Sequence, residues 1–197
     1  MSTSPGLRER KKAKTRRAIQ DAAVRLTTEQ GFDNTTVDQI AEAAEISPST
    51  FFRYFPTKED AVLSDDYDPL FVAAIAEARS AGNPIAAIRQ AMRSVSDVLD
   101  RDRAQIHQRT KLILTTPTLR VRLADGMLET ERLIRDAYAE QAGRGIDTDS
   151  EALLGAAMGV LTVVMTRWTE GSPHDDIIGM LDHALSLIDP AERAGTG

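Results

Sequence analysis

Two helix-start signals lie close together in the N-terminal third of the sequence, and they fix the geometry of the chain between them. Residues 36–39 have the pattern of a capping box, with Thr36 as the N-cap. Ser47-Pro48 is a second start, because the missing N–H of proline costs nothing at the first helical position. Only Glu45 and Ile46 separate the two predicted helices, so the second must cross the first steeply. This is the geometry of a helix-turn-helix.

Neighbouring segments extend this motif into one domain. Residues 11–30 carry apolar side chains on one helical face, and Gly31 ends that helix where glycine is favoured. Residues 48–54 form the candidate recognition helix, and a third capping pattern, Thr57-x-x-Asp60, begins the next helix. We therefore expect residues 11–63 to fold as a helix-turn-helix domain.

The candidate recognition helix is unusually aromatic. Residues 50–55 hold four of the nine aromatic residues in the chain. Successive helical positions turn by about 100°, so one side of a short helix cannot bury four rings. Some rings must therefore face outward beside Ser49, Thr50 and Arg53. Aromatic, hydroxyl and cationic groups on one exposed surface suit contact with phosphates and base edges, which predicts a DNA-binding surface.

A basic run precedes the domain. Residues 8–17 contain seven Lys or Arg and one acid, a local charge of +6. Most such runs are solvated, frayed termini, and that interpretation stays open here. Because this run leads into a helix-turn-helix, we favour contact with phosphate or the minor groove, with residues 1–10 as a flexible arm and Arg16 and Arg17 as contacts.

Residues 15–63 resemble the DNA-binding domain of the TetR family of one-component bacterial transcriptional regulators. As a set, the matching segments form a specific signature, which the helix-turn-helix pattern alone does not. They are Ala22-Ala23, Gly31-Phe32, Thr35-Thr36-Val37, Ile40-Ala41, Ile46-Ser47, residues 50–55 and Lys58-Glu59.

The resemblance implies roles for individual residues. Phe51 and Phe55 match core positions, whereas the hydroxyl of Thr36 matches a phosphate contact. Phosphate contacts are also implied for Arg53, Tyr54 and Lys58, and base contacts for the first turn and outer face of the recognition helix. The full predicted DNA-binding set is Arg16, Arg17, Thr36, Ser47, Pro48, Ser49, Thr50, Phe52, Arg53, Tyr54 and Lys58.

Three positions depart from the family pattern. Glu45 stands where the family usually has a glycine in the turn, a position that favours positive φ. Either the turn follows a variant path or Glu45 is strained. Pro48 and Ser49 replace a frequent Lys/Arg-Gly pair, which affects the bases contacted. Binding itself rests mainly on phosphate contacts.

Composition limits the class of protein. The net charge is −6, but residues 1–60 carry +1 and residues 61–197 carry −7, as expected of a DNA-facing end and an acidic body. There are no cysteines, the three histidines are scattered, and no common catalytic motif occurs. We expect no enzymatic activity, metal or cofactor. No apolar run approaches the roughly 20 residues of a membrane span, which predicts a cytoplasmic protein without membrane contact.

Proline and glycine breaks divide residues 64–190 into about five helices, with no strand-like alternation. An all-α fold is therefore predicted, and the resemblance implies that this region is a helical ligand-binding and dimerisation domain. Residues 191–197 are expected to be a disordered tail.

Two apolar segments, residues 153–168 and 177–188, are candidates for a two-fold interface. We favour a homodimer in which these helices and their copies form a four-helix bundle; the alternative is that they are the core of a monomer. The predicted interface residues are Gly155, Gly159, Val163, Ile177, Leu181, Ala184 and Ile188.

Methionines at helical spacing on the first of these segments suggest an adaptable ligand cavity, although such a stripe is often plain core. Arg109 could meet an anionic head group or belong to a solvated cationic patch. Thr116-Pro117-x-Leu119-Arg120 and the Arg167-Trp168 ending are similar to a TetR subgroup thought to sense acyl-CoA-like molecules. The predicted pocket is Met92, Arg109, Met127, Met158, Thr162, Met165 and Trp168.

The function predicted from the sequence is a repressor that binds a palindromic double-stranded DNA operator as a homodimer. A small apolar or amphipathic effector, acyl-CoA-like in one version, would release it. A ligand-dependent activator and a co-repressed regulator are alternatives that the sequence does not separate. A helical protein–protein interaction module is a further alternative from another class.

Overall fold

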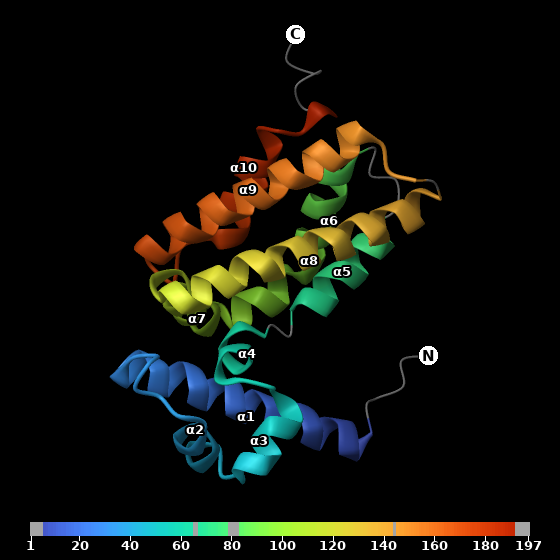
Figure 1. Ribbon diagram of the computed structural model, residues 1–197. Helices are drawn as coiled ribbons and strands as arrows, with labels where there is room; N and C mark the ends of the chain where they lie inside the picture. The colour runs from blue at the N-terminus through green and yellow to red at the C-terminus, as the bar shows by residue number, and fades with distance from the viewer. Residues whose placement is uncertain (1–5, 65–66, 79–82, 144, 192–197) are drawn as a thin grey trace.

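The computed structural model describes residues 6–64, 67–78, 83–143 and 145–191. The described chain is helical and contains no strand, which confirms the all-α prediction. Figure 1 shows a small lower unit, the head (α1–α4), joined to a larger helical body (α5–α10). The helices are α1 Leu7–Gln30, α2 Val37–Ala43, α3 Pro48–Tyr54, α4 Lys58–Leu63, α5 Asp68–Glu77, α6 Pro84–Arg101, α7 Arg103–Thr115, α8 Pro117–Ala142, α9 Thr148–Glu170 and α10 Ile177–Ser186.

Local capping opens the short helices of the head. The side chain of Thr36 accepts from the N–H of Gln39 at 3.2 Å, and the Gln39 amide oxygen accepts in return from the Thr36 N–H at 2.9 Å. Ser47 caps α3 and Thr57 caps α4 by the same kind of bond. These three helix starts are confirmed where the sequence predicted them.

The core of the head includes residues from the body. Phe51 and Phe55 of the recognition-helix segment are 0% and 1% exposed, which confirms their predicted core positions. They pack in one cluster with Ile113 of α7 and Leu119 of α8. The turn between α7 and α8 is therefore inserted into the head, and the two units share a hydrophobic core.

The body contains six helices within its described residues, one more than the sequence predicted. The extra break falls between α6 and α7 at Asp102, which has φ −105° and ψ 12°. Neither proline nor glycine marks it. The carboxylate of Asp102 instead accepts hydrogen bonds from Arg17, 85 residues away, and Tyr67, 35 residues away. Long-range contacts therefore accompany a break that local sequence does not signal.

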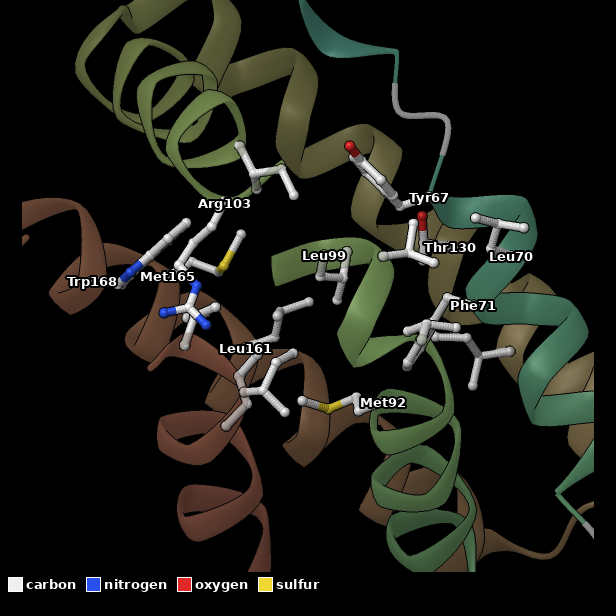
Figure 2. Close-up of a pocket in the computed structure, with 17 residues that line it drawn as sticks. Tyr67, Leu70, Phe71, Met92, Leu99, Arg103, Thr130, Leu161, Met165 and Trp168 are labelled. Carbon is white, nitrogen blue, oxygen red and sulfur yellow. The ribbon is translucent and has the colours of Figure 1, made fainter. Parts of the chain in front are cut away.

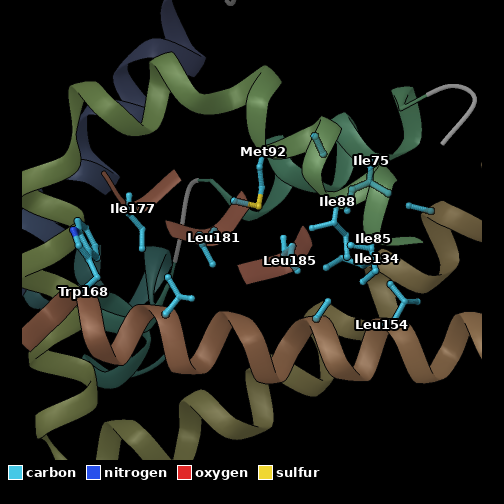
Figure 3. Close-up of a cluster of buried hydrophobic side chains, with 14 residues drawn as sticks. Ile75, Ile85, Ile88, Met92, Ile134, Leu154, Trp168, Ile177, Leu181 and Leu185 are labelled. Atoms are coloured by element: carbon cyan, nitrogen blue, oxygen red, sulfur yellow. The ribbon is translucent and has the colours of Figure 1, made fainter. Parts of the chain in front are cut away.

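The core of the body lies between α5, α6, α8, α9 and α10. Figure 3 shows side chains from these helices in one cluster, among them Met92 of α6, Trp168 of α9 and Leu181 of α10. The predicted apolar face of α6 is confirmed, because Ile85 and Ile88 are buried there. One side of α9 remains uncovered, and only 28% of its most apolar window is buried.

Helix α9 also corrects a prediction from composition. An 18-residue window of this helix has a mean hydropathy of 1.4, so by length and composition alone α9 could cross a membrane. The sequence analysis expected no such run. Buried helices of water-soluble proteins meet the same criterion, and α9 packs against α6, α7, α8 and α10.

An ion-pair cluster fixes α10 to α6. The Arg89 guanidinium donates to Asp182 at 2.9 Å and to the buried Asp189 at 3.3 Å, and Arg93 reaches Asp182 at 2.8 Å. The hydrogen bond from Arg89 lowers the pKa of the Asp182 carboxyl below its ordinary value, because it stabilises the charged form.

Candidate DNA interface and effector cavities

A basic groove runs between α1 and α3, and we call it the α1–α3 groove. Its volume is about 700 Å³. Since α1 already begins at Leu7, residues spaced by three and four from position 8 share the helical face that lines it. The lining residues are Arg8, Glu9, Lys11, Lys12, Thr15, Arg53 and Tyr54. The groove therefore joins the basic run to the recognition helix.

The start of α1 corrects the expected flexible arm. Residues 7–10 are helical, and residues 1–5 of the predicted arm lie outside the described residues. The helix starts four residues earlier than predicted because its N-cap is Gly6, which has no side chain that could signal the start. Continuing the helical spacing upstream would have found Arg8, Lys11 and Lys12.

Arg16 and Arg17 make contacts within the protein. The Arg16 guanidinium carbon lies 4.4 Å from the centroid of the Phe55 ring, a cation–π contact. Arg17 Nη2 lies 3.2 Å from Oδ2 of Asp102 in the body. Arg16 and Arg17, predicted as DNA contacts, thus have partners inside the protein, whereas Arg8, Lys11 and Lys12 line the groove.

The outer face of α3 carries most of the residues predicted to contact DNA. Pro48, Ser49, Phe52 and Arg53 are exposed, and the Phe52 side chain is 55% exposed beside the fully buried Phe51. The Ser47 hydroxyl lies 2.9 Å from that of Ser49 and 3.0 Å from that of Thr50, so three hydroxyls gather at the start of α3. This cluster presents donors and acceptors to a ligand at the helix N-terminus.

Lys58 differs from its prediction as a phosphate contact. Its ammonium donates to the backbone oxygens of Phe32 at 2.7 Å and Thr35 at 2.9 Å, and lies 4.3 Å from the Phe32 ring centroid. Two of its three N–H donors are therefore used inside the head. These bonds tie α4 to the loop that carries the exposed Thr36, so Lys58 holds a predicted contact in place.

The turn between α2 and α3 resolves the alternatives for Glu45. Its φ is 55°, and among the described residues it is the one non-glycine residue with a positive φ. The turn thus keeps the left-handed geometry, and Glu45 is strained by roughly 1–2 kcal/mol relative to a right-handed residue.

The body contains a partly open apolar cavity of about 200 Å³, which we call the inner cavity. Figure 2 shows side chains from α5, α6, α8 and α9 around it, with Phe71 and Met92 among them. Polar groups are few, and they are Tyr67, Arg103, Thr130 and the indole of Trp168. Such a lining suits an apolar ligand whose orientation is fixed by a few polar contacts.

A second pocket of about 240 Å³, the side pocket, lies beside the inner cavity. The two share Thr130, Leu161 and Met165 as a common wall. The predicted pocket residues divide between them: Met92, Met165 and Trp168 line the inner cavity, and Arg109, Met127, Met158, Thr162 and Met165 line the side pocket. Sequence reasoning missed Thr130 and Leu161, which no motif marks.

A third, smaller pocket of about 40 Å³ lies where the head meets the body, and we call it the junction pocket. It adjoins the inner cavity, because Tyr67 and Ile106 line both. Its charged lining residues are Arg17 and Arg109, and Arg109 Nη1 donates to the Ser64 oxygen at 2.9 Å. Arg109 is thus shared by the side pocket and the junction pocket.

The predicted dimer-interface residues separate into two groups. Gly155, Gly159 and Val163 are exposed on the uncovered side of α9, and a Cβ added at either glycine would meet nothing within 4 Å. Ala184 and Ile188 are partly exposed. Ile177 and Leu181 are each only 7% exposed, and both line the inner cavity.

The placement of Ile177 and Leu181 is a correction. They face the core of their own protomer, so they do not belong to a surface that a second copy could cover. Periodicity identified the apolar face of α10 but carried no information about what packs on it.

Within the described residues, no group of three or more His, Asp or Glu is placed to hold a metal ion.

A basic helix-turn-helix head on a helical body with apolar cavities defines a one-component DNA-binding regulator. The chain belongs to the TetR family. The model for bacterial regulatory proteins of the tetR family matches residues 19–63, and the model for the MftR C-terminal domain matches residues 82–192. The protein is therefore a DNA-binding transcriptional regulator of this family, which confirms the resemblance found in the sequence.

Individual relatives agree with this assignment. The HTH-type transcriptional regulator TcmR of Streptomyces glaucescens is 38% identical over 157 residues, which cover 75% of this chain and 68% of TcmR. The solved structure of Thermus thermophilus FadR, a TetR-family repressor in complex with lauroyl-CoA, has a TM-score of 0.52 and 27% identity, covering 88% of this chain and 92% of FadR. A fatty acid degradation regulator, FadR of Bacillus halodurans, has a TM-score of 0.60 at 19% identity over 94% and 96% of the chains, which shows the fold alone.

Proposed function

We propose that this regulator is a repressor that binds a palindromic operator as a homodimer and is released when an effector occupies the body. The observation that carries the proposal is the shared core: the α7–α8 turn of the cavity-bearing body is inserted into the DNA-binding head. A ligand that shifts this turn must also shift the helices that dock on DNA.

The docking surface would be the α1–α3 groove together with the outer face of α3. Arg8, Lys11, Lys12 and Arg53 line the groove and supply cations that can neutralise phosphates. Phe52 and Ser49, exposed on α3, would contact base edges and the thymine methyl group. Phosphate contacts would position the head on the DNA, and the outer face of α3 would recognise the base sequence of the operator.

The uncovered side of α9 supports the homodimer. It is apolar, it carries glycines that allow close backbone approach, and the described protomer leaves it open. Pairing with a second copy would bury this surface. A two-fold dimer would also place two recognition helices about 34 Å apart or slightly more, one turn of DNA, which matches a palindromic site.

The effector would be a small apolar or amphipathic molecule. The inner cavity and the side pocket share the Met165 wall, and methionine side chains adapt to ligands of different shape. The likeness to FadR bound to lauroyl-CoA supports an acyl-CoA-like molecule as one candidate. A cavity of about 200 Å³ would hold the acyl portion and leave a nucleotide outside.

Two connections would couple the cavities to the DNA. Ile113 and Leu119 transmit movements of α7 and α8 into the head core. Tyr67, which lines the inner cavity, donates to Asp102 at 2.6 Å, and the same carboxylate oxygen accepts from Arg17 of α1 at 3.2 Å. A coupling free energy of about 2–3 kcal/mol would lower operator affinity roughly 30- to 150-fold, which is enough for release.

Selection of genomic DNA fragments by the purified full-length protein tests the proposal. At about 50 mM salt we expect enrichment of a short palindrome, and at about 200 mM salt the same fragments bound far more weakly. Uniform weak retention of all fragments, or none, would contradict a repressor that binds without its effector. As a cytoplasmic regulator, the protein would meet both DNA and metabolite in one compartment.

A further inference from the structure

The junction pocket and the inner cavity differ in chemistry although they adjoin. The inner cavity is almost entirely apolar, whereas the junction pocket is lined by Arg17, Gln20, Gln105 and Arg109 together with the hydroxyl-bearing Tyr67. Tyr67 and Ile106 form the boundary between the two. A molecule that fills the apolar compartment and passes this boundary would place its end among cations and amides.

The charges of the junction pocket select the type of end group. Among the described residues that line it, the charged ones are both arginines, and guanidinium groups pair with carboxylates through parallel hydrogen bonds. The pocket volume of about 40 Å³ exceeds the space that one water needs and suits a group of carboxylate size.

Arg17 and Tyr67 already bind one carboxylate, that of Asp102. Both donate to its Oδ2, at 3.2 Å and 2.6 Å, and this carboxylate connects the head to the α6–α7 break. A ligand carboxylate in the junction pocket would have the same chemistry and would compete with Asp102 for these donors. Losing the Asp102 contact would remove one of several polar links between α1 and the body.

We propose that the junction pocket is an anion subsite of the effector site, which binds the carboxylate of an amphipathic acid whose apolar chain lies in the inner cavity. The proposal rests on the proposed function and deepens it. Arg109 is the main counter-ion, and Arg17 and Tyr67 exchange Asp102 for the ligand. Effector binding thereby acts directly on a residue of the head.

The test uses octanoate and octanamide, which share a chain and differ in charge at one end. Benzene fits a cavity of about 150 Å³, so a cavity of about 200 Å³ accommodates a chain of this length. Trp168, the single tryptophan of the chain, lines the inner cavity and reports occupancy by fluorescence without DNA. We expect the wild-type protein to bind octanoate at least about tenfold more tightly than octanamide.

Variants of Arg109 then test whether this residue causes the preference for octanoate over octanamide. Arg109→Met removes the cation and keeps the apolar stem, and it should bring the octanoate-to-octanamide ratio close to one. Arg109→Lys keeps the charge and should retain much of the preference even if the bond to Ser64 is weakened. Arg132→Met is the matched control, because the Arg132 side chain is 63% exposed on α8 and lines none of the three pockets, so its loss should leave the ratio unchanged.

Several results would overturn the subsite. These are equal affinities for octanoate and octanamide, no binding of either probe, or a preference for octanoate that is unchanged in Arg109→Met. Failure of the proposed repressor is a separate result, because it appears as the absence of operator selection whatever the probes do. Octanoyl-CoA as a third probe distinguishes a free acid from a thioester, since the thioester carries no charge at the chain end. Tighter binding of octanoyl-CoA than of octanoate would contradict a carboxylate subsite.

Discussion

The head and the body of this regulator are both helical, but they are specified over different distances along the chain. Thr36, Ser47 and Thr57 open helices of the head through bonds to residues three positions away. In the body, the break at Asp102 is accompanied by contacts from residues 35 and 85 positions away. Because local capping signals set the helices of the head, they can be predicted from the sequence. The helices of the body depend more on how they pack against one another.

The same contrast separates the two functional surfaces. Residues expected to contact DNA lie at fixed spacings on α3, so their exposure follows from the helix alone. Cavity residues come from helices that are distant in sequence, and the two pockets share a wall that only tertiary structure creates. Mutations that affect one region and spare the other test this division.

The largest effect should come from the core of the head. Phe51→Ala removes a fully buried ring and should destabilise the head by about 3–5 kcal/mol, abolishing DNA binding. Phe52→Ala, at the neighbouring exposed position, should change stability by less than about 0.5 kcal/mol and still weaken operator binding. Unfolding followed by circular dichroism, with Trp168 fluorescence as a separate report on the body, checks both. Equal destabilisation by the two variants would contradict the assigned faces of α3.

A charge on α9 should break the dimer and leave the head folded. Val163 is 63% exposed on the uncovered side, and Val163→Glu would bury an unpaired carboxylate at the proposed interface. We expect the dimer dissociation constant to rise roughly 100-fold, about 2.8 kcal/mol, measured by sedimentation. Leu128→Glu is the control, because Leu128 is 67% exposed but lies on α8. A dimer that tolerates Val163→Glu would exclude this face as the interface.

Relief of strain in the turn should give a smaller, stabilising effect. Glu45→Gly allows the positive φ without a Cβ penalty, and the entropy cost of glycine offsets part of the gain. The net expectation is an increase of up to about 1 kcal/mol in the free energy of unfolding. Glu42→Gly, inside α2, should instead lower it by about 1 kcal/mol. Loss of stability in Glu45→Gly would show that Glu45 is not strained.

The smallest effect concerns the response of the body to acid. The pKa of Asp182 is lowered in the folded protein by its hydrogen bond from Arg89, so this interaction stabilises the body above the ordinary carboxyl pKa of about 3.9. The contribution disappears as the pH falls through the lowered pKa. Asp182→Asn should therefore be less stable than wild type at pH 7, and the difference should shrink near pH 3. Urea unfolding at both pH values measures it, with Asp125→Asn, an exposed change on α8, as the control.

Much of the head could be predicted from sequence, including the bounds of α3 and the burial of Phe51 and Phe55. The start of α1 was missed because its first turn lacks a capping side chain. Lys58 was assigned by its position in the motif, which says nothing about the two backbone oxygens that it binds. Even in the head, the partner of a side chain depends on tertiary structure.

In the body, sequence pattern identified helices and apolar faces but not what those faces pack on. Ile177 and Leu181 have the spacing of an interface and instead close the inner cavity. Arg109 lines the junction pocket, which exists only because α1, α7 and the chain before α5 meet there. Cavities are made by several distant segments, and periodicity within one segment cannot reveal them.

The most direct test of the account is the salt dependence of operator affinity for a double variant of the α1–α3 groove. Each lost phosphate contact should lower the slope of log affinity against log salt by about 0.9. Lys12→Ala with Arg53→Ala removes two contacts from each protomer, so the slope of the dimer should fall by roughly 3.6, whereas Arg132→Ala, an exposed change on α8, should leave it unchanged. An unchanged slope in the double variant would contradict the proposal that this groove binds the phosphates of the DNA backbone.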